Sequence, residues 1–104
     1  MYIDFIFFKK QFQSKSDLVS DVKKFLENKL DYKSGHINYN ENKIKCIIDS
    51  SNIKRAVPVR IKIDDETESN IEIFSTCKEI IKNHSKKDFY LNISYDGLSR
   101  YFSN

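Results

Sequence analysis

Residues 2–8, YIDFIFF, are rich in aromatic and β-branched side chains, a composition that predicts a β-strand. The stretch begins with apolar and polar side chains in alternation and becomes almost continuously apolar after Asp4. A strand without a polar side is typical of the interior of a sheet, where both faces are covered. We therefore expect residues 2–8 to form a central strand.

The following stretch, SKSDLVSDVKKFLENKL at residues 14–30, predicts an amphipathic helix. Ser14 with Asp17 three residues later resembles a capping box. Apolar residues then recur at helical spacing and predict one stripe that faces the core. The members of this stripe are Leu18, Val22, Phe25, Leu26 and Leu30. We expect Gly35 to end this helical region.

Three short strands are predicted next, separated by the polar turns NENK and SSNIK. They are HINY (36–39), KIKCIID (43–49) and AVPVRIKI (56–63). In the last of them, Pro58 has no N–H to donate to a neighbouring strand. This residue predicts an edge position or a local bulge for that strand.

Residues 64–86 allow two interpretations. In the first, which we favour, a long helix begins with a capping box of Ser69 and Glu72. In the second, residues 70–74 form a strand that pairs back on its predecessor, and a shorter helix begins near Thr76. The long helix has an apolar stripe made of Ile71, Phe74, Cys77, Ile81 and His84.

The C-terminal part predicts one further strand at residues 88–95, DFYLNISY, because its apolar residues alternate. Asp96-Gly97 is a tight-turn signal, and LSRYF at 98–102 is a candidate short returning strand. The predicted order is β-α-β-β-β-α-β. It indicates an α+β fold in which two helices pack on one face of an antiparallel sheet of four to five strands.

The 104 residues contain only two glycines and one proline, so no flexible linker is evident, and we expect one domain over residues 1–104. The residues expected in its core share apolar character and inward-facing positions. They are Phe5, Leu18, Val22, Phe25, Leu26, Ile44, Cys46, Val59, Ile61, Phe74, Ile81, Phe89, Leu91 and Ile93.

The residue types that metal binding and catalysis require are scattered along the chain. His36, Cys46, Cys77 and His84 contain no C-x₂-C or H-x₃-H pair. Cys77 and His84 are two helical turns apart, which separates their Cα atoms by about 10 Å. Cysteine is among the residue types most often buried in protein cores, even without a disulfide. We therefore expect no catalytic residue, cofactor, metal or small-molecule substrate, and no enzyme activity.

The N-terminal residues do not have the pattern of a signal peptide. Asp4 interrupts the apolar run, Lys9 and Lys10 follow it, and no small-residue cleavage site is present. No stretch approaches the length of about 20 apolar residues that spans a bilayer. We expect a cytoplasmic protein that does not contact a membrane.

The chain has a formal net charge of +3, yet five of its fifteen carboxylates lie within nine residues. We call these residues the acidic strip: Asp64, Asp65, Glu66, Glu68 and Glu72. Carboxylates near a helix N-terminus stabilise the helix, which explains one or two of them. The other explanation is a docking surface for a basic protein, because complementary charge accelerates association and raises specificity.

A small α+β domain that is rich in Lys, Asn and Ile, has an acidic strip and no active-site signature resembles bacterial immunity proteins. These include the ones encoded beside contact-dependent growth inhibition toxins. The resemblance implies a non-catalytic inhibitor that binds a nuclease-type toxin domain tightly, with the acidic strip as its partner-binding residues. The net positive charge departs from the acidic character of many nuclease inhibitors.

The alternative is a small RNA-binding domain with a basic sheet face. The stretches KIKCI, KRAVPVRIK and LSRYF have basic residues at positions that can point outward. Nucleic acid is an expected partner only under this alternative.

Overall fold

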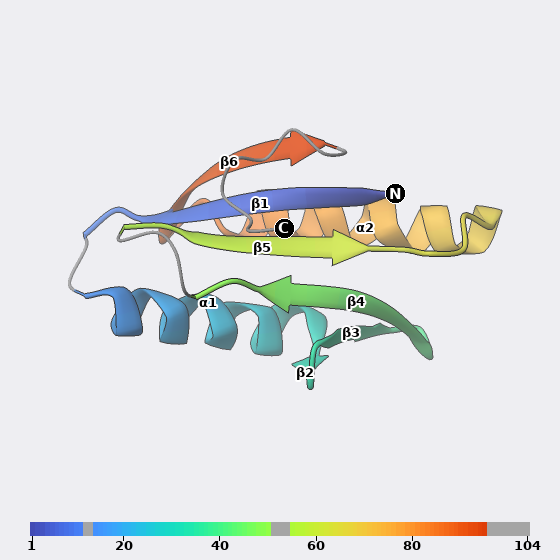
Figure 1. Cartoon of the computed structure of the whole chain (residues 1–104), viewed down its shortest axis with the longest axis horizontal. Helices are drawn as coiled ribbons and strands as arrows, with labels where there is room; N and C mark the ends of the chain where they lie inside the picture. Colours follow the sequence, from blue (N-terminus) through green and yellow to red (C-terminus); the bar gives the residue numbers. More distant parts are fainter. Residues whose placement is uncertain (12–13, 51–54, 96–104) are drawn as a thin grey trace.

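The computed structural model describes residues 1–11, 14–50 and 55–95, and it has two helices and a six-stranded sheet (Figure 1). The elements in chain order are β1 (Tyr2–Lys9), α1 (Lys15–Leu30), β2 (Tyr32–Lys33), β3 (His36–Tyr39), β4 (Asn42–Ile48), β5 (Val57–Lys62), α2 (Glu68–His84) and β6 (Phe89–Tyr95). The strands lie in the order β2-β3-β4-β5-β1-β6, and each neighbouring pair is antiparallel. The α+β prediction is confirmed, with six strands instead of four to five.

The additional strand is β2, which forms a two-residue hairpin with β3. Ser34 and Gly35 occupy its turn at φ values of 52° and 80°. A turn with two successive positive φ values matches the twist of an antiparallel pair of strands. Gly35 adopts its positive φ without steric cost because it has no Cβ. The prediction that Gly35 ends the first helical region is wrong, because α1 ends at Leu30 and Asp31 caps it in the left-handed conformation.

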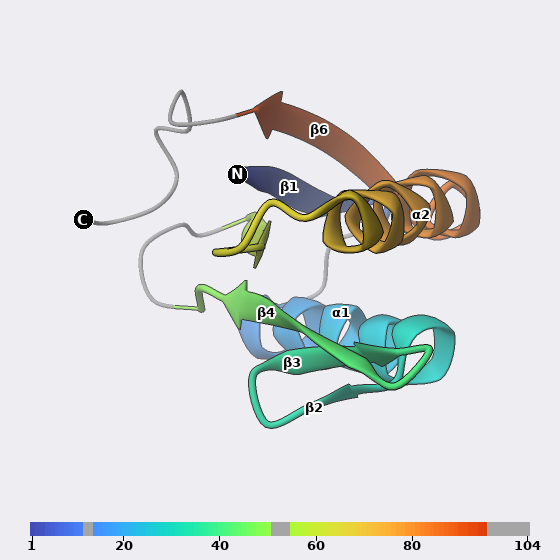
Figure 2. The ribbon, with the colours of Figure 1, turned by 90° about the vertical axis from the view of Figure 1, so that its right-hand side faces the viewer.

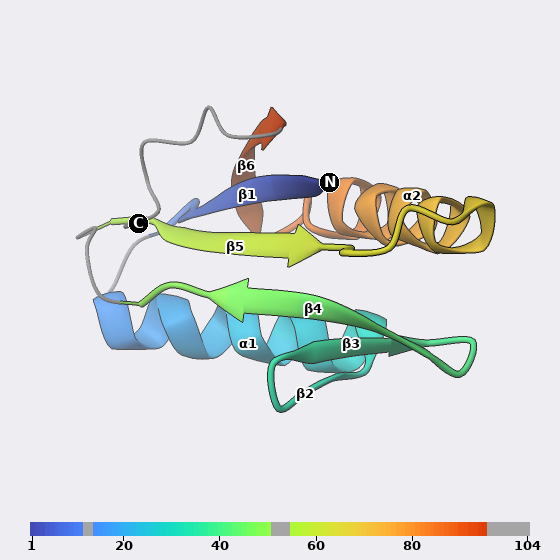
Figure 3. The ribbon, with the colours of Figure 1, turned by 45° about the vertical axis from the view of Figure 1, so that its right-hand side comes forward.

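Both helices lie on the same side of the sheet, as predicted. Figure 2 shows α2 next to β1 and β6 and α1 next to β3 and β4, and Figure 3 shows α1 running alongside β4. The buried core contains side chains from both helices and from one face of β1, β3, β4 and β5. This helix-covered face is the inner face of the sheet, and the opposite face is its outer face.

Strand β1 lies between β5 and β6, which confirms its predicted central position. Ile3, Phe5 and Phe7 belong to the core under the helices. Asp4 and Ile6 alternate with them and point to the outer face, where both are also buried. Both faces of β1 are therefore covered.

Most of the predicted core is confirmed. The predicted residues that are buried are Phe5, Leu18, Val22, Leu26, Ile44, Cys46, Val59, Ile61, Phe74, Ile81 and Phe89. Three others, Phe25, Leu91 and Ile93, are half-buried and pack against this cluster. The Phe25 ring nevertheless lies 5.9 Å from Phe7 and 5.8 Å from Phe89, centroid to centroid.

The prediction that Pro58 places its strand at an edge or in a bulge is wrong. Strand β5 lies between β4 and β1, and its register with β1 is continuous through Pro58. The Pro58 carbonyl accepts a hydrogen bond from the Asp49 N–H at 2.9 Å. The N–H and C=O of a strand residue point to the same side. The position at which Pro58 lacks an N–H therefore faces Asp49, one residue beyond the end of β4. The proline therefore costs the ladder a bond only at its end.

The long helix predicted after residue 63 is confirmed as α2, but its cap differs. The Thr67 hydroxyl accepts from the Asn70 N–H at 3.1 Å, so the helix begins before the predicted capping box of Ser69. At the other end, His84 is exposed instead of belonging to the apolar stripe. The buried residue one turn beyond Ile81 is Ser85.

The remaining local predictions are confirmed where they can be compared. The Ser14 hydroxyl caps α1 by accepting from the Asp17 N–H at 3.1 Å. Strand β6 covers the predicted 88–95 stretch except its first residue. The predicted turn at 96–97 and strand at 98–102 lie outside the described residues.

No described helix combines the length and apolar character needed to cross a membrane.

A buried ion pair connects the two central strands. The Asp4 carboxylate is 0% exposed and accepts hydrogen bonds from Arg60 Nε at 2.6 Å and Nη2 at 3.0 Å. The two residues are directly opposite in the β1–β5 register. The Arg60 guanidinium also lies 3.9 Å from the centroid of the Tyr2 ring. Both carboxylate oxygens therefore have a partner in the interior.

We expect the Asp4→Val substitution to destabilise the fold by about 3 kcal/mol, because it leaves a partly buried guanidinium without its carboxylate. The double variant Asp4→Val/Arg60→Met replaces the pair by apolar side chains and should recover at least half of that loss. The free energy of unfolding in urea is the measurement. Equal stability of the single and double variants would contradict an energetic role for the pair.

Candidate functional site

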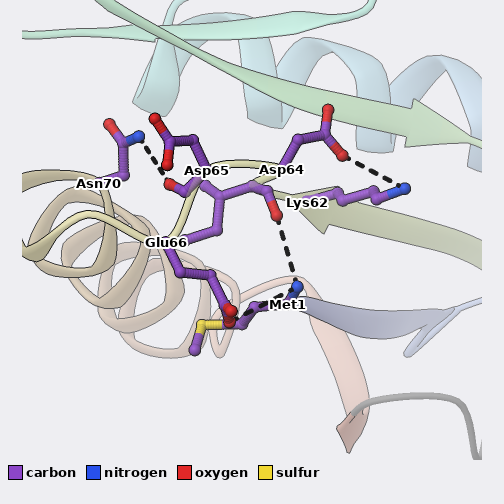
Figure 4. A network of polar contacts seen from close by, with 7 residues as sticks. Met1, Lys62, Asp64, Asp65, Glu66 and Asn70 are labelled. Atoms are coloured by element: carbon purple, nitrogen blue, oxygen red, sulfur yellow. Dashed lines mark hydrogen bonds and ion pairs between the residues drawn. The ribbon is translucent and has the colours of Figure 1, made fainter.

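Three residues of the acidic strip, Asp64, Asp65 and Glu66, lie in the connection between β5 and α2 (Figure 4). The other two, Glu68 and Glu72, lie in the first turns of α2. All five of its side chains are exposed. They follow Ile63, which is buried, so the chain leaves the core and enters solvent at this point. The structure therefore brings the predicted partner-binding residues to one end of the molecule.

Several hydrogen bonds hold the backbone under the acidic strip. The Met1 amino group donates to the Ile63 carbonyl at 3.4 Å, and the Asn70 side-chain amide donates to the Asp65 carbonyl at 2.8 Å. The Thr67 hydroxyl accepts from the backbone of Asn70 and so fixes the start of α2. Hydrogen bonds thus connect the loop to the N-terminal end of β1 and to helix α2.

Some of the five carboxylates have structural roles of their own. Asp64 lies 3.4 Å from Lys62 Nζ, and Glu66 lies 3.8 Å from the Met1 amino group. Exposed pairs of this kind contribute about 0–1 kcal/mol. Glu68 is in the first turn of α2, where its negative charge interacts favourably with the helix dipole and stabilises the helix.

Asp65 and Glu72 differ from the other three. Within the described part of the chain, neither carboxylate makes an ion pair. Neither is in a position that capping or the first turn requires. These two side chains are the part of the acidic strip that the fold does not explain.

Cys77 and His84, the nearest pair of candidate ligands in the sequence, do not face each other. Cys77 is buried under the sheet and His84 is exposed at the end of α2. Burial raises the pKa of the Cys77 thiol to about 11. Burial, and to a lesser extent the nearby Cys77, raise the pKa of Cys46 to about 12. Among the described residues, no three His, Cys, Asp or Glu side chains are grouped so that they could hold a metal ion.

His36 lies on the outer face of the sheet, where the ring Nδ1 donates to the Ser34 carbonyl at 3.1 Å. It lines an open hollow of about 480 Å³. The other residues around this hollow are polar or charged: Asp31, Lys33, Ser34, Asn38 and Lys43. The sequence analysis assigned His36 no catalytic or metal-binding role.

The outer face also contains an arrangement that the sequence analysis missed. The strand register aligns Lys33 with His36, His36 with Lys45, and Lys45 with Lys62. We call these four residues the basic row. The stretches KIKCI and KRAVPVRIK signalled Lys45 and Lys62, and His36 lay in the predicted 36–39 strand, but the register that aligns these residues was not predicted. Lys33 was missed because β2 was not predicted.

Comparisons with known proteins give no relative: no protein-family model, no curated protein and no solved structure matches the chain.

The thiols give a direct test of the buried positions. At about pH 8, pKa values near 11 and 12 leave so little thiolate that labelling of the folded protein by a disulfide reagent should be at least about 100-fold slower than labelling in concentrated urea. Both thiols should react once the chain is unfolded. Fast labelling of the native protein would contradict the burial of Cys46 and Cys77.

Proposed function

We propose that the protein is a non-catalytic, cytoplasmic inhibitor of the immunity type, which neutralises a nuclease-type toxin domain by forming a tight complex with it. The observation that carries the proposal is the acidic strip, an exposed set of carboxylates on the β5–α2 connection and the first turns of α2, where hydrogen bonds hold the backbone. The contact is assigned to Asp64, Asp65, Glu66, Glu68 and Glu72.

The chemistry of a nuclease partner supports this assignment. A nuclease contacts the phosphates of its substrate through Lys and Arg, so it has a basic surface. An acidic strip complements such a surface, steers the encounter and disfavours acidic partners. The hydrogen bonds of Asn70 and Met1 hold the loop before binding, which reduces the entropy that association must overcome.

The alternative function, RNA binding, depends on different residues. It requires cations on the outer face of the sheet and makes no use of the acidic strip. The two functions therefore respond oppositely to added positive charge at the strip: a basic toxin is repelled, and a polyanion is attracted.

The decisive variant is Asp65→Lys/Glu72→Lys, which reverses the two carboxylates that make no ion pair with any described residue. The proposal expects a toxin domain to be encoded in a neighbouring reading frame, and that domain is the binding partner to use in the experiment. At low salt we expect its association rate constant to fall by roughly tenfold or more, with a smaller effect at high salt, because exposed charges act mainly on encounter. Protection of growing cells against that domain should weaken in parallel.

A matched control is Glu27→Lys/Asp88→Lys, which makes the same charge change at exposed residues of α1 and of the α2–β6 connection. It should leave association within about twofold of the wild-type rate, since long-range steering is screened beyond about 8 Å at physiological salt. A strip variant with unchanged association and protection would overturn the proposal. The proposal would also be overturned if the only defect of the strip variant were a lower melting temperature. In that case the carboxylates would serve to stabilise the start of α2.

A further inference from the structure

The outer face of β2–β5 has a continuous basic surface. Residues Tyr32, Ile37, Cys46 and Ile61 pack in or against the core, so the residues that alternate with them point to the opposite face. These outward residues form the basic row, one from each of four adjacent strands: Lys33, His36, Lys45 and Lys62. Adjacent strands are about 4.8 Å apart, so the row extends over about 14 Å.

The outward positions of the strands beside the basic row are positively charged or neutral. A second outward pair, Asn38 and Lys43, lies beside it on β3 and β4. The outward positions of β2, β3 and β4 contain no carboxylate. Within the described ranges, Lys33, Lys43 and Lys45 make no ion pair, and all three are exposed. Among the described residues, Lys62 is the one member of the row with a carboxylate partner, Asp64 at 3.4 Å.

The hollow at the β2–β3 end of the row adds hydrogen-bonding groups to this charge. It has a volume of about 480 Å³ and is lined by Ser34, His36 and Asn38 as well as by lysines. One residue with a carboxylate, Asp31, also lines it. Neutral donors next to cations suit a ligand that has both phosphates and sugar or base groups.

We propose that the basic row binds the phosphate backbone of single-stranded RNA, with the hollow beside Lys33 and His36 receiving a sugar or base. Lysines act as point charges and do not read base edges in a fixed geometry, so the binding is governed by phosphate contacts and is tolerant of sequence. The basic row is the surface that the alternative function would use, and it meets the acidic strip at Lys62 and Asp64. RNA binding by the row does not depend on the proposed inhibitor function.

The test measures the anisotropy of a fluorescein-labelled single-stranded RNA of about 12 nucleotides, titrated with the whole protein over a range of salt concentrations. Phosphate-dominated binding without sequence preference typically has a Kd of about 10⁻⁴–10⁻⁶ M. For the variant Lys33→Gln/Lys45→Gln we expect at least tenfold weaker binding at low salt. The slope of log K against log salt is negative, and its magnitude should decrease by about 1.4, because each phosphate contact on a single strand contributes about 0.7.

The control is Lys23→Gln/Lys24→Gln, which removes the same charge from exposed positions of α1 on the helix side of the sheet. It should bind RNA within about twofold of the wild type. Because all four lysines are exposed, circular dichroism and the melting temperature should not change in either variant. These measurements do not involve the toxin domain, so they can fail or succeed independently of the inhibitor function.

Three outcomes would overturn the proposal. The first is no RNA binding by the wild type at any salt concentration. The second is an equal loss of RNA affinity in Lys33→Gln/Lys45→Gln and in Lys23→Gln/Lys24→Gln, which would show that binding depends on the net charge and not on the basic row. The third is binding of poly-glutamate as tight as that of RNA, which would indicate an acidic protein as the occupant of this face.

Discussion

The buried pair of Asp4 and Arg60 constrains how the two central strands can align. Side chains alternate between the faces of a strand, so a slip of one residue between β1 and β5 would move Asp4 into the apolar layer beneath the helices. An unpaired carboxylate there would cost several kcal/mol. The observed register avoids this cost, because it places both carboxylate oxygens within 3.0 Å of Arg60 and leaves Ile3, Phe5 and Phe7 in the core.

The same register determines where the charged surfaces lie. It pairs Tyr2 with Lys62, so the N-terminal end of β1 lies beside the last residue of β5. Met1 then reaches the Ile63 carbonyl and Glu66, and the chain turns away from the sheet as the acidic strip. Lys62 itself stays on the outer face as the last member of the basic row. One alignment of two strands thus positions the end of one surface and the beginning of the other.

Local patterns in the sequence predicted the elements well, because caps, helical spacing and strand alternation depend on near neighbours. Ser14, the stripe of α1 and the 36–39 strand are examples. Features that depend on pairing were missed. Pro58 suggested an edge, but the position of β5 between β4 and β1 is decided by partners far away in the chain. The acidic strip was visible because its residues are contiguous, whereas the basic row joins four strands and exists only through their register.

The two charged surfaces are close together, yet at physiological salt they act largely independently. Their one direct contact is the exposed pair of Lys62 and Asp64 at 3.4 Å. The Debye length at this ionic strength is about 8 Å, and the opposite end of the row, Lys33, lies three strand spacings away, at about 14 Å. The field of the carboxylates is therefore mostly screened before it reaches the hollow beside Lys33. Segregating charge in this way lets a chain with a net charge of only +3 present an acidic and a basic surface together, since neither neutralises the other.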